Sequence, residues 1–300
     1  MFSIITANWN GAKYLDSYLS SLVKQTYQDF NVYIVDNGST DESFDILSKY
    51  EAKLKLRIIK LNKNTGFAVA NNIGIEEAMK DESEYLITLN NDLELDPKCL
   101  EIIFKDIEKA NRAYDIYQIL MLNYFERNII DAAGLDFDRY LNSYQIGYKK
   151  DKEILPSIST EIKGACAGAA VYSKKALNKV QEKNGDYFDS RFFAYYEDVD
   201  LALRLLNAGF KSRLLKDALV YHIHSGTGVK GSYFKEYYLS RNDLIYRKKN
   251  LSTEQFNRFR PVFVFYAFKK IVRLTLEGNF TLIKGCIKGY QDYFKISNSI

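Results

Sequence analysis

The sequence predicts an α/β fold in which a mostly parallel sheet is flanked by helices. Apolar runs rich in β-branched and aromatic residues recur along the first ninety residues, and segments with helical periodicity lie between them. Such βαβ alternation is typical of a sheet covered by helices, with ligands bound beyond the carboxyl ends of its strands. Polar residues follow several of these runs, so the loops after them are the first places to look for a site.

The first part of the chain is the most regular. The apolar residues within 15–23 form one stripe of an expected helix. Ser39 and Glu42 form an S-x-x-E pattern that predicts a capping box at the next helix, with Phe44 and Leu47 on its apolar face. The expected strands span residues 2–6, 31–36, 56–61 and 85–90.

The spacing of apolar residues is less regular between residues 114 and 160 and becomes regular again at Gly164. The small residues that open 164–173 suit backbone that approaches a ligand closely. A helix is expected over 197–207, ended by Gly209. The expected strands of this part lie at 116–122, within 129–137, at 211–215 and at 219–223, and the chain after Gly231 is expected to be helical.

Composition excludes several classes of protein. The 300 residues are 47% hydrophobic and 27% charged, with a net charge of +4, which excludes disorder, collagen-like repeats and disulfide scaffolds. Three widely spaced cysteines without a C-x-x-C pair favour a reducing compartment. No secretory signal is evident, and no uncharged apolar run approaches the roughly 18 residues needed to cross a bilayer. We therefore expect a cytoplasmic protein.

Charge is unevenly distributed along the chain. Residues 1–230 carry 29 basic and 33 acidic side chains, whereas residues 231–300 carry 13 and 5. This division predicts a first domain over 1–230 and a basic, aromatic-rich helical extension over 231–300, with Pro261 in the first turn of a helix. The extension is either a peripheral contact with anionic lipid at the inner face of the membrane or a packed cap that forms a homodimer interface. No RNA-binding signature is present, so we expect no nucleic-acid partner.

Two motifs follow predicted strands. Asp36, in VDNGSTD, stands at a strand end, where a carboxylate either accepts the N–H of a uracil-type base or satisfies turn amides. Asn90, Asn91 and Asp92 follow the fourth strand. Their oxygens either bind Mg²⁺ or Mn²⁺ and the phosphates it bridges, or form an ordinary Asn/Asp turn.

Two further motifs carry ionisable groups. Glu197 and Asp198 begin a helix, where acidic residues complement the helix dipole. Beside the aromatic residues of 192–196, on which sugar rings stack, they also suit a general base with a raised pKa. His222 and His224 lie two apart on an expected strand and face the same way, so they are either structural or part of a metal shell.

In this order, the motifs resemble those of glycosyltransferase family 2, nucleotide-sugar-dependent enzymes of the GT-A fold. The resemblance covers residues 1 to about 250 and is strongest to a bacterial branch that contains rhamnosyltransferases of cell-surface polysaccharide assembly, such as capsule or O-antigen. The motifs that carry it are SIITANWNG, DNGSTD, NTGFAVANNIGI, LNND, GACAGAAV, FFAYYEDVDLALRL and VYHIHSGTG.

The resemblance implies a role for each matching residue. The residues it assigns to the nucleotide are Thr6, Ala7, Asn8, Asp36, Asn64, Gly66, Asn71, Asn90 and Asn91. It assigns Mg²⁺ or Mn²⁺ to Asp92 and His222, and Asn90 departs from the D-x-D pattern because it replaces a carboxylate with a neutral amide. It makes Asp198 the catalytic base and Glu197 its neighbour, and it gives His224 no clear role.

The implied reaction is transfer of a sugar from a dTDP- or UDP-sugar donor, with dTDP-rhamnose a candidate, to a hydroxyl of a glycan or lipid-linked saccharide. We expect inversion in a single displacement, because the base lies on the acceptor side and no nucleophile is evident opposite. Two alternatives stay open: a nucleotidyltransferase and a non-catalytic nucleotide-sugar-binding module. The sequence ITANWNGAKYL lacks the glycine-rich basic loop of the former, whereas Asn90 favours the latter.

Overall fold

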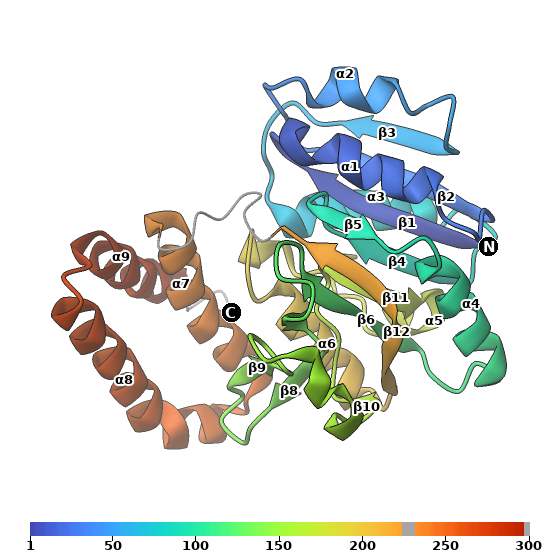
Figure 1. Ribbon diagram of the computed structural model, residues 1–300. Helices are drawn as coiled ribbons and strands as arrows, with labels where there is room; N and C mark the ends of the chain where they lie inside the picture. The colour runs from blue at the N-terminus through green and yellow to red at the C-terminus, as the bar shows by residue number, and fades with distance from the viewer. Residues whose placement is uncertain (224–231, 297–300) are drawn as a thin grey trace.

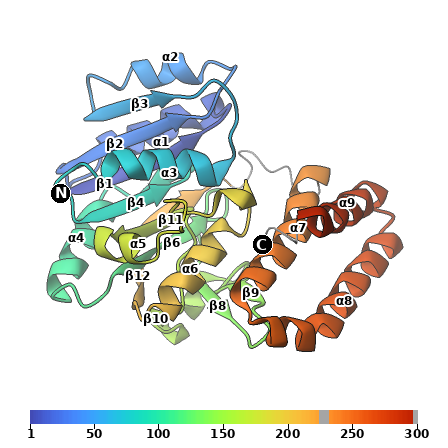
Figure 2. The ribbon, with the colours of Figure 1, turned by 180° about the vertical axis from the view of Figure 1, so that it is seen from behind.

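The computed structural model describes residues 1–223 and 232–296, and it has the predicted α/β architecture. Within these ranges ten strands form one sheet with helices on both faces, and three C-terminal helices lie to one side of it (Figures 1 and 2). The main order of the sheet is β10-β12-β6-β11-β4-β1-β2-β3, with β5 beside β12 and β7 beside β6.

The first part of the chain forms the parallel half of the sheet, as predicted. β1 lies between β2 and β4, and β3 follows β2 at the edge, all in parallel. Apolar residues of α1, α2 and α4 cover one face, while those of α3, α5 and α6 cover the other. The elements are β1 (Phe2–Asn8), α1 (Ala12–Val23), β2 (Phe30–Asp36), α2 (Ser43–Ser48), β3 (Leu56–Lys60), α3 (Phe67–Ala78) and β4 (Tyr85–Leu89).

The second part of the chain completes the sheet with mixed strand directions. β11 runs antiparallel between β4 and β6, and β12 returns parallel to β6. The elements are β5 (Leu93–Leu95), α4 (Cys99–Lys109), β6 (Ile116–Asn123), β7 (Ile130–Ala132), β8 (Leu135–Phe137), β9 (Ser143–Gln145), the 3₁₀ turn η1 (Lys152–Ser157), β10 (Glu161–Ile162), β11 (Ala169–Ser173), α5 (Lys174–Lys179), the 3₁₀ turn η2 (Ser190–Phe192), α6 (Glu197–Asn207) and β12 (Ser212–His222).

Three local predictions within residues 1–223 were wrong. The two strands expected at 211–223 are one strand, β12, whose register shifts between Leu215 and Leu219. The capping box is absent, because the Ser39 hydroxyl instead accepts hydrogen bonds from the Asn10 backbone and the Asn8 side chain. Phe44 is exposed at the surface, where the Lys60 ammonium lies 3.8 Å from its ring centroid.

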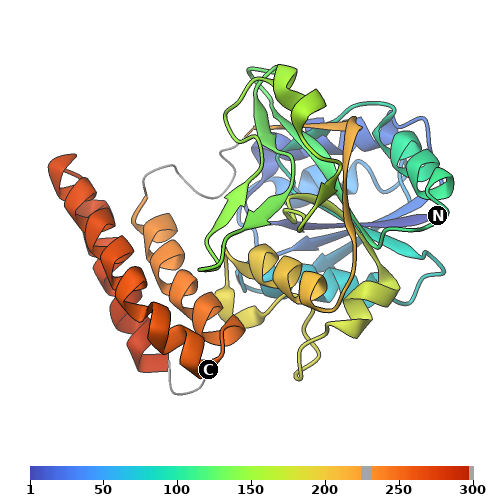
Figure 3. The ribbon, with the colours of Figure 1, turned by 90° about the horizontal axis from the view of Figure 1, so that it is seen from below.

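The C-terminal helices form a layer beside the sheet (Figure 3). They are α7 (Tyr233–Asn250), α8 (Thr253–Leu276) and α9 (Phe280–Ile296). α9 approaches α7 closely, since a Cβ on Gly289 would lie 2.5 Å from the carbonyl oxygen of Tyr237. Pro261 lies inside α8 rather than in its first turn. None of the described helices is both long enough and apolar enough to span a bilayer.

Candidate active site

Three of the predicted nucleotide-site residues form one hydrogen-bonded chain at the carboxyl ends of parallel strands. The Asn8 amide, at the end of β1, donates to Asp36 at the end of β2 over 3.0 Å. The side-chain oxygen of Asn8 accepts a hydrogen bond from the Asn91 amide, just after β4, over 2.7 Å. All three side chains are buried. A Cβ on Gly11 would lie 2.2 Å from the side-chain amides of both Asn8 and Asn91, so a larger residue there would displace this pair.

The segment around Gly66 links these hydrogen-bonded side chains to the helix that carries the predicted base. The Asn37 amide, next to Asp36, donates to the Asn64 side-chain oxygen over 3.1 Å. Gly66 has a φ of +89°, and a Cβ there would lie 2.5 Å from the Phe193 carbonyl oxygen. Only glycine adopts this conformation at low cost with a backbone so close. Asn64 and Gly66 therefore lie between the strand ends and the loop that precedes α6.

Three predicted residues present little side chain to a ligand. The Thr6 hydroxyl pairs with the Tyr18 hydroxyl at 2.6 Å and is fully buried. The Asn71 amide donates to the Phe67 carbonyl within α3 and is 1% exposed. Ala7 is half-buried and has only a methyl group. Any contact of these residues with a ligand would chiefly involve their backbone.

The predicted metal ligands, Asp92 and His222, are neighbours. His222 Nε2 lies 3.2 Å from Asp92 Oδ1, and its Nδ1 lies 2.5 Å from Asp131 Oδ2 on β7. Burial lowers the pKa of His222, but hydrogen bonds to Asp131 and Asp92 outweigh it and raise the pKa to about 9. Sequence reasoning missed Asp131, because it lies 91 residues before His222 in an irregular part of the chain.

This arrangement fits a divalent cation. A carboxylate oxygen and an imidazole nitrogen at 3.2 Å are ligands that Mg²⁺ or Mn²⁺ accepts, although imidazole is the softer one and must first lose the proton that its raised pKa retains. Asp131 supplies the second contact that fixes the ring orientation of a metal-binding histidine. Asn90 begins the same loop, tied by its backbone N–H to the Gly168 carbonyl at 2.9 Å. His224 lies outside the described residues.

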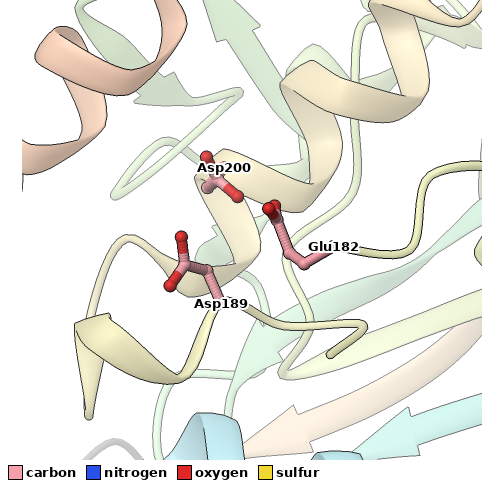
Figure 4. A group of neighbouring side chains, drawn as sticks. All are labelled: Glu182, Asp189 and Asp200. Carbon is pink, nitrogen blue, oxygen red and sulfur yellow. The ribbon is translucent and has the colours of Figure 1, made fainter. Parts of the chain in front are cut away.

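A second acidic cluster has a structural role. Oxygens of Glu182, Asp189 and Asp200 lie within 4.8 Å of one another beside α6 (Figure 4). The Lys249 ammonium, on α7, lies 2.5–2.8 Å from all three carboxylates. Arg204 also pairs with Glu182 and Asp200. Arg191 pairs with Asp189 in turn, so three cations balance the three carboxylates, and we assign no metal to this cluster.

Replacing Lys249 is expected to destabilise the protein. Lys249→Ala would leave partly or fully buried carboxylates close together, and breaking a buried ion pair costs about 3–5 kcal/mol. Urea unfolding should show that loss in the free energy of unfolding. The control is Lys248→Ala on the same helix, whose ammonium lies 5.4 Å from the Phe256 ring centroid and whose loss should cost at most about 1 kcal/mol. Equal effects of the two changes would contradict the assigned role.

Glu197 and Asp198 occupy the first turn of α6, as predicted. Asp198 accepts hydrogen bonds from the backbone N–H groups of Val199 (2.8 Å) and Ala167 (3.4 Å). Glu197 is 6% exposed, and within the described residues its Oε2 is buried without a hydrogen-bond partner. Burial, reinforced by the neighbouring Asp198 charge, raises the pKa of Glu197 well above its ordinary value. Burial also raises the pKa of Asp198, although its backbone hydrogen bonds oppose this.

The loop before this pair has an unusual backbone that α7 holds in place. Phe193, Tyr195 and Tyr196 have φ values of 63°, 67° and 75°, a conformation that costs non-glycine residues about 1–3 kcal/mol each. The buried Asn242 amide, on α7, lies 2.8 Å from the carbonyl oxygens of Phe192, Ala194 and Tyr195. Sequence reasoning missed Asn242, since nothing in its local pattern links it to this loop.

The aromatic residues of this loop are not equally available to a sugar. Phe192 is fully buried and belongs to the core. Phe193 stacks on Tyr238 with ring centroids 5.1 Å apart. Tyr196 donates to Asp243 at 2.9 Å, which turns its hydroxyl toward α7. Stacking on a sugar is therefore excluded for Phe192, and Tyr195, which is half-buried, remains a candidate.

Comparison with known proteins identifies related sequences. Residues 3–181 match the family described as glycosyl transferase family 2. The chain is 34% identical over 94 residues to the poly(ribitol-phosphate) beta-N-acetylglucosaminyltransferase TarS of Staphylococcus aureus, which covers 30% of this chain and 16% of TarS. It is 27% identical over 205 residues to the glycosyltransferase GlyG of Streptococcus pneumoniae, which covers 63% of this chain and 62% of GlyG. The chain thus spans less than two thirds of the length of either relative.

Solved structures share the fold. The crystal structure of S. aureus TarS 1–349 in complex with UDP has a TM-score of 0.55 and 22% identity, over 86% of this chain and 71% of that one. GalNAc-T7 with UDP, GalNAc and Mn²⁺ has a TM-score of 0.60 and 16% identity, over 81% and 50% of the two chains. These neighbours have the GT-A fold, so the predicted fold class is confirmed.

Proposed function

The chain belongs to glycosyl transferase family 2, and we propose that it is an inverting enzyme that transfers a sugar from a nucleoside-diphosphate donor to an acceptor hydroxyl. The observation that carries the proposal is the continuous hydrogen-bonded arrangement at the strand ends. It joins Asp36 through Asn8 to Asn91, and the next residue, Asp92, contacts His222. We therefore propose that this edge of the sheet offers a carboxylate to the base and a pair of ligands to a cation.

The donor is proposed to be a UDP- or dTDP-sugar. Asp36 would accept the N3–H that uracil and thymine share, which would favour these bases over cytosine. The UDP in the TarS complex supports a uridine donor, while the likeness of the sequence motifs to rhamnosyltransferases favours dTDP-rhamnose. Asn64 and Gly66 are proposed to lie along the nucleotide and ribose.

Metal dependence is proposed from the side chains that could coordinate a cation. Asp92 and His222 would hold Mg²⁺ or Mn²⁺, and the Mn²⁺ in the GalNAc-T7 structure supports this. Such a cation would neutralise the charge that develops on the departing diphosphate. Asp131, through its contact with Nδ1, would hold the His222 ring in the orientation needed to bind it.

Asp198 is proposed to remove the proton from the acceptor hydroxyl. A general base must be ionised yet basic enough to take a proton, and burial moves the pKa of Asp198 in that direction. Burial and the Asp198 charge also raise the pKa of the neighbouring Glu197, which favours a single negative charge on the pair. A base on the acceptor side fits direct displacement, which inverts the anomeric centre.

The acceptor is proposed to be a growing glycan or lipid-linked saccharide of the cell surface. TarS, whose name specifies a poly(ribitol-phosphate) acceptor, supports a polymer of that kind. The cysteines Cys99, Cys166 and Cys286 are free thiols, which supports a reducing, cytoplasmic location. We also propose that the catalytic domain ends near residue 230 and that residues 231–300 form an extension, from which α7 supports the α6 loop.

The proposed function is tested with a panel of donors. UDP-GlcNAc, UDP-glucose, UDP-galactose and dTDP-rhamnose are incubated with the protein and Mn²⁺, and released nucleoside diphosphate is measured with and without saccharide acceptors. Release that depends on Mn²⁺ and rises with acceptor is expected for one donor class. Tight nucleotide binding without release across the panel would instead favour the binding module, and pyrophosphate-dependent breakdown of a nucleotide sugar to a nucleoside triphosphate and a sugar 1-phosphate would favour the nucleotidyltransferase.

Asn242 is expected to matter for turnover because it holds the loop before Asp198. Asn242→Ala removes the hydrogen bonds that hold this strained backbone in place. A small misplacement of a catalytic group costs up to about 100-fold in rate. We expect kcat to fall about 10- to 100-fold with little change in the KM for the donor. Asn250→Ala on the same helix, which contacts Asp200, is the control and should leave kcat within about threefold. Unchanged kcat in Asn242→Ala would contradict the role of α7.

A further inference from the structure

The C-terminal helices α8 and α9 carry large apolar side chains that are exposed at the surface. On α8, Phe265, Phe268, Val272 and Leu276 follow one another at intervals of three or four residues, so they form one stripe. They are 60%, 64%, 39% and 84% exposed. Only Phe263 and Leu274 of this 24-residue helix are buried. Folding of this chain alone therefore does not account for the apolar content of α8.

The neighbouring helix α9 carries a similar apolar stripe. On α9, Phe280, Ile287 and Phe294 recur at every seventh residue and therefore share one face. Each is at least 42% exposed. In the views from two directions, α8 and α9 lie on the side of the molecule away from the sheet (Figures 1 and 3).

Positive charge borders these apolar residues. Lys269 follows Phe265 by four residues, so it lies along the edge of the stripe. Arg258, Lys269 and Lys284 are exposed, and none has an ion-pair partner within the described part of the chain. Residues 231–300 as a whole carry 13 basic and 5 acidic side chains. The surface therefore combines large apolar side chains with uncompensated cations.

We propose that the exposed face of α8 and α9 binds the surface of an anionic lipid bilayer, with the aromatic rings inserted among the acyl chains. An amphipathic helix that pairs aromatic and aliphatic side chains with Lys and Arg binds in the plane of such an interface. A second copy of the chain fits less well, since it would bring two strongly basic surfaces together, whereas anionic headgroups neutralise them. This inference concerns binding alone and does not rest on the proposed reaction.

The test is co-sedimentation of the full chain with vesicles. Binding to phosphatidylcholine vesicles that contain about a third phosphatidylglycerol should exceed binding to pure phosphatidylcholine, and salt should weaken it. Phe265→Ser with Phe268→Ser is expected to weaken binding at least tenfold. Arg258→Gln with Lys269→Gln should weaken it about 25-fold, since each basic residue near the surface contributes about fivefold.

Matched controls lie on the catalytic domain. Phe125→Ser removes a ring that is 74% exposed, and Lys150→Gln removes an exposed cation, yet both should bind vesicles like the unchanged protein. All of these residues are exposed, and thermal melts of the variants should match. Equal binding to both kinds of vesicle, or binding that ignores the phenylalanine changes, would overturn the proposal. So would a dimer, seen by light scattering, that the phenylalanine changes dissociate.

Discussion

Asp198→Asn is expected to lower kcat about 1,000-fold while leaving affinity for the nucleotide sugar unchanged. General-base catalysis contributes roughly 10²–10⁴-fold to a rate, and an amide of the same size cannot accept the proton. The substitution preserves an oxygen that can accept the hydrogen bond from the Val199 N–H, so the start of α6 should keep its geometry. The loss should therefore appear in transfer and not in folding.

Two measurements separate chemistry from binding. Nucleoside-diphosphate release in the presence of acceptor reports kcat, and isothermal titration with the nucleotide sugar reports affinity. Asp217→Asn, an exposed carboxylate on β12, is the matched control and should behave as the unchanged protein. Turnover of Asp198→Asn within tenfold of normal would remove Asp198 from the mechanism.

The pH profile supplies an independent signature of the same group. The base acts when ionised, and burial raises the pKa of Asp198 above its ordinary value. Activity should therefore fall as pH decreases through this raised pKa, at a higher pH than an ordinary aspartate would give. The Asp198→Asn variant should lose this acid limb from its residual rate.

Sequence patterns predicted the parallel half of the fold because each element there is a local feature. The apolar run from Phe2 is long enough to be a buried strand, and Asp36 follows a strand end directly. The position of β11 was not predictable in this way: it lies antiparallel between β4 and β6, and that pairing depends on residues far apart in the chain. Ser39 shows the same limit, since its capping pattern yielded to tertiary hydrogen bonds from Asn8 and Asn10.

The candidate site shows the same difference between local features, which could be predicted, and distant contacts, which could not. Motif residues at strand ends, such as Asn8, Asp36 and Asn91, could be placed from their position after apolar runs. Asp131 and Asn242 could not, because each acts on a residue 47 or more positions away and lies in a segment without a motif. Asn242 is buried, but α7 contains many other polar residues, so nothing in the sequence distinguishes it from them. Residues that position others are thus harder to predict than those that contact a ligand.

Asp92→Asn is expected to abolish stimulation by Mn²⁺ and to lower kcat by about three orders of magnitude. The LNND motif contributes only one carboxylate, so the change leaves this strand end without a negative ligand for a cation. His222 would remain, and its pKa, raised by both Asp131 and Asp92, should fall once one of these carboxylates is gone. Titration of the protein with Mn²⁺, followed by electron paramagnetic resonance, measures the loss of affinity without relying on turnover.

Asp131→Asn separates direct binding from orientation. This change keeps both proposed ligands but weakens the contact that fixes the His222 ring, and loss of such a contact typically costs 10- to 100-fold in metal affinity or activity. Mn²⁺ affinity should therefore fall in the order unchanged protein, Asp131→Asn, Asp92→Asn. If Asp92→Asn kept normal Mn²⁺ affinity while Asp131→Asn lost it, the cation would have to lie on the Asp131 side of the imidazole. Normal affinity in both variants would place it away from His222 altogether.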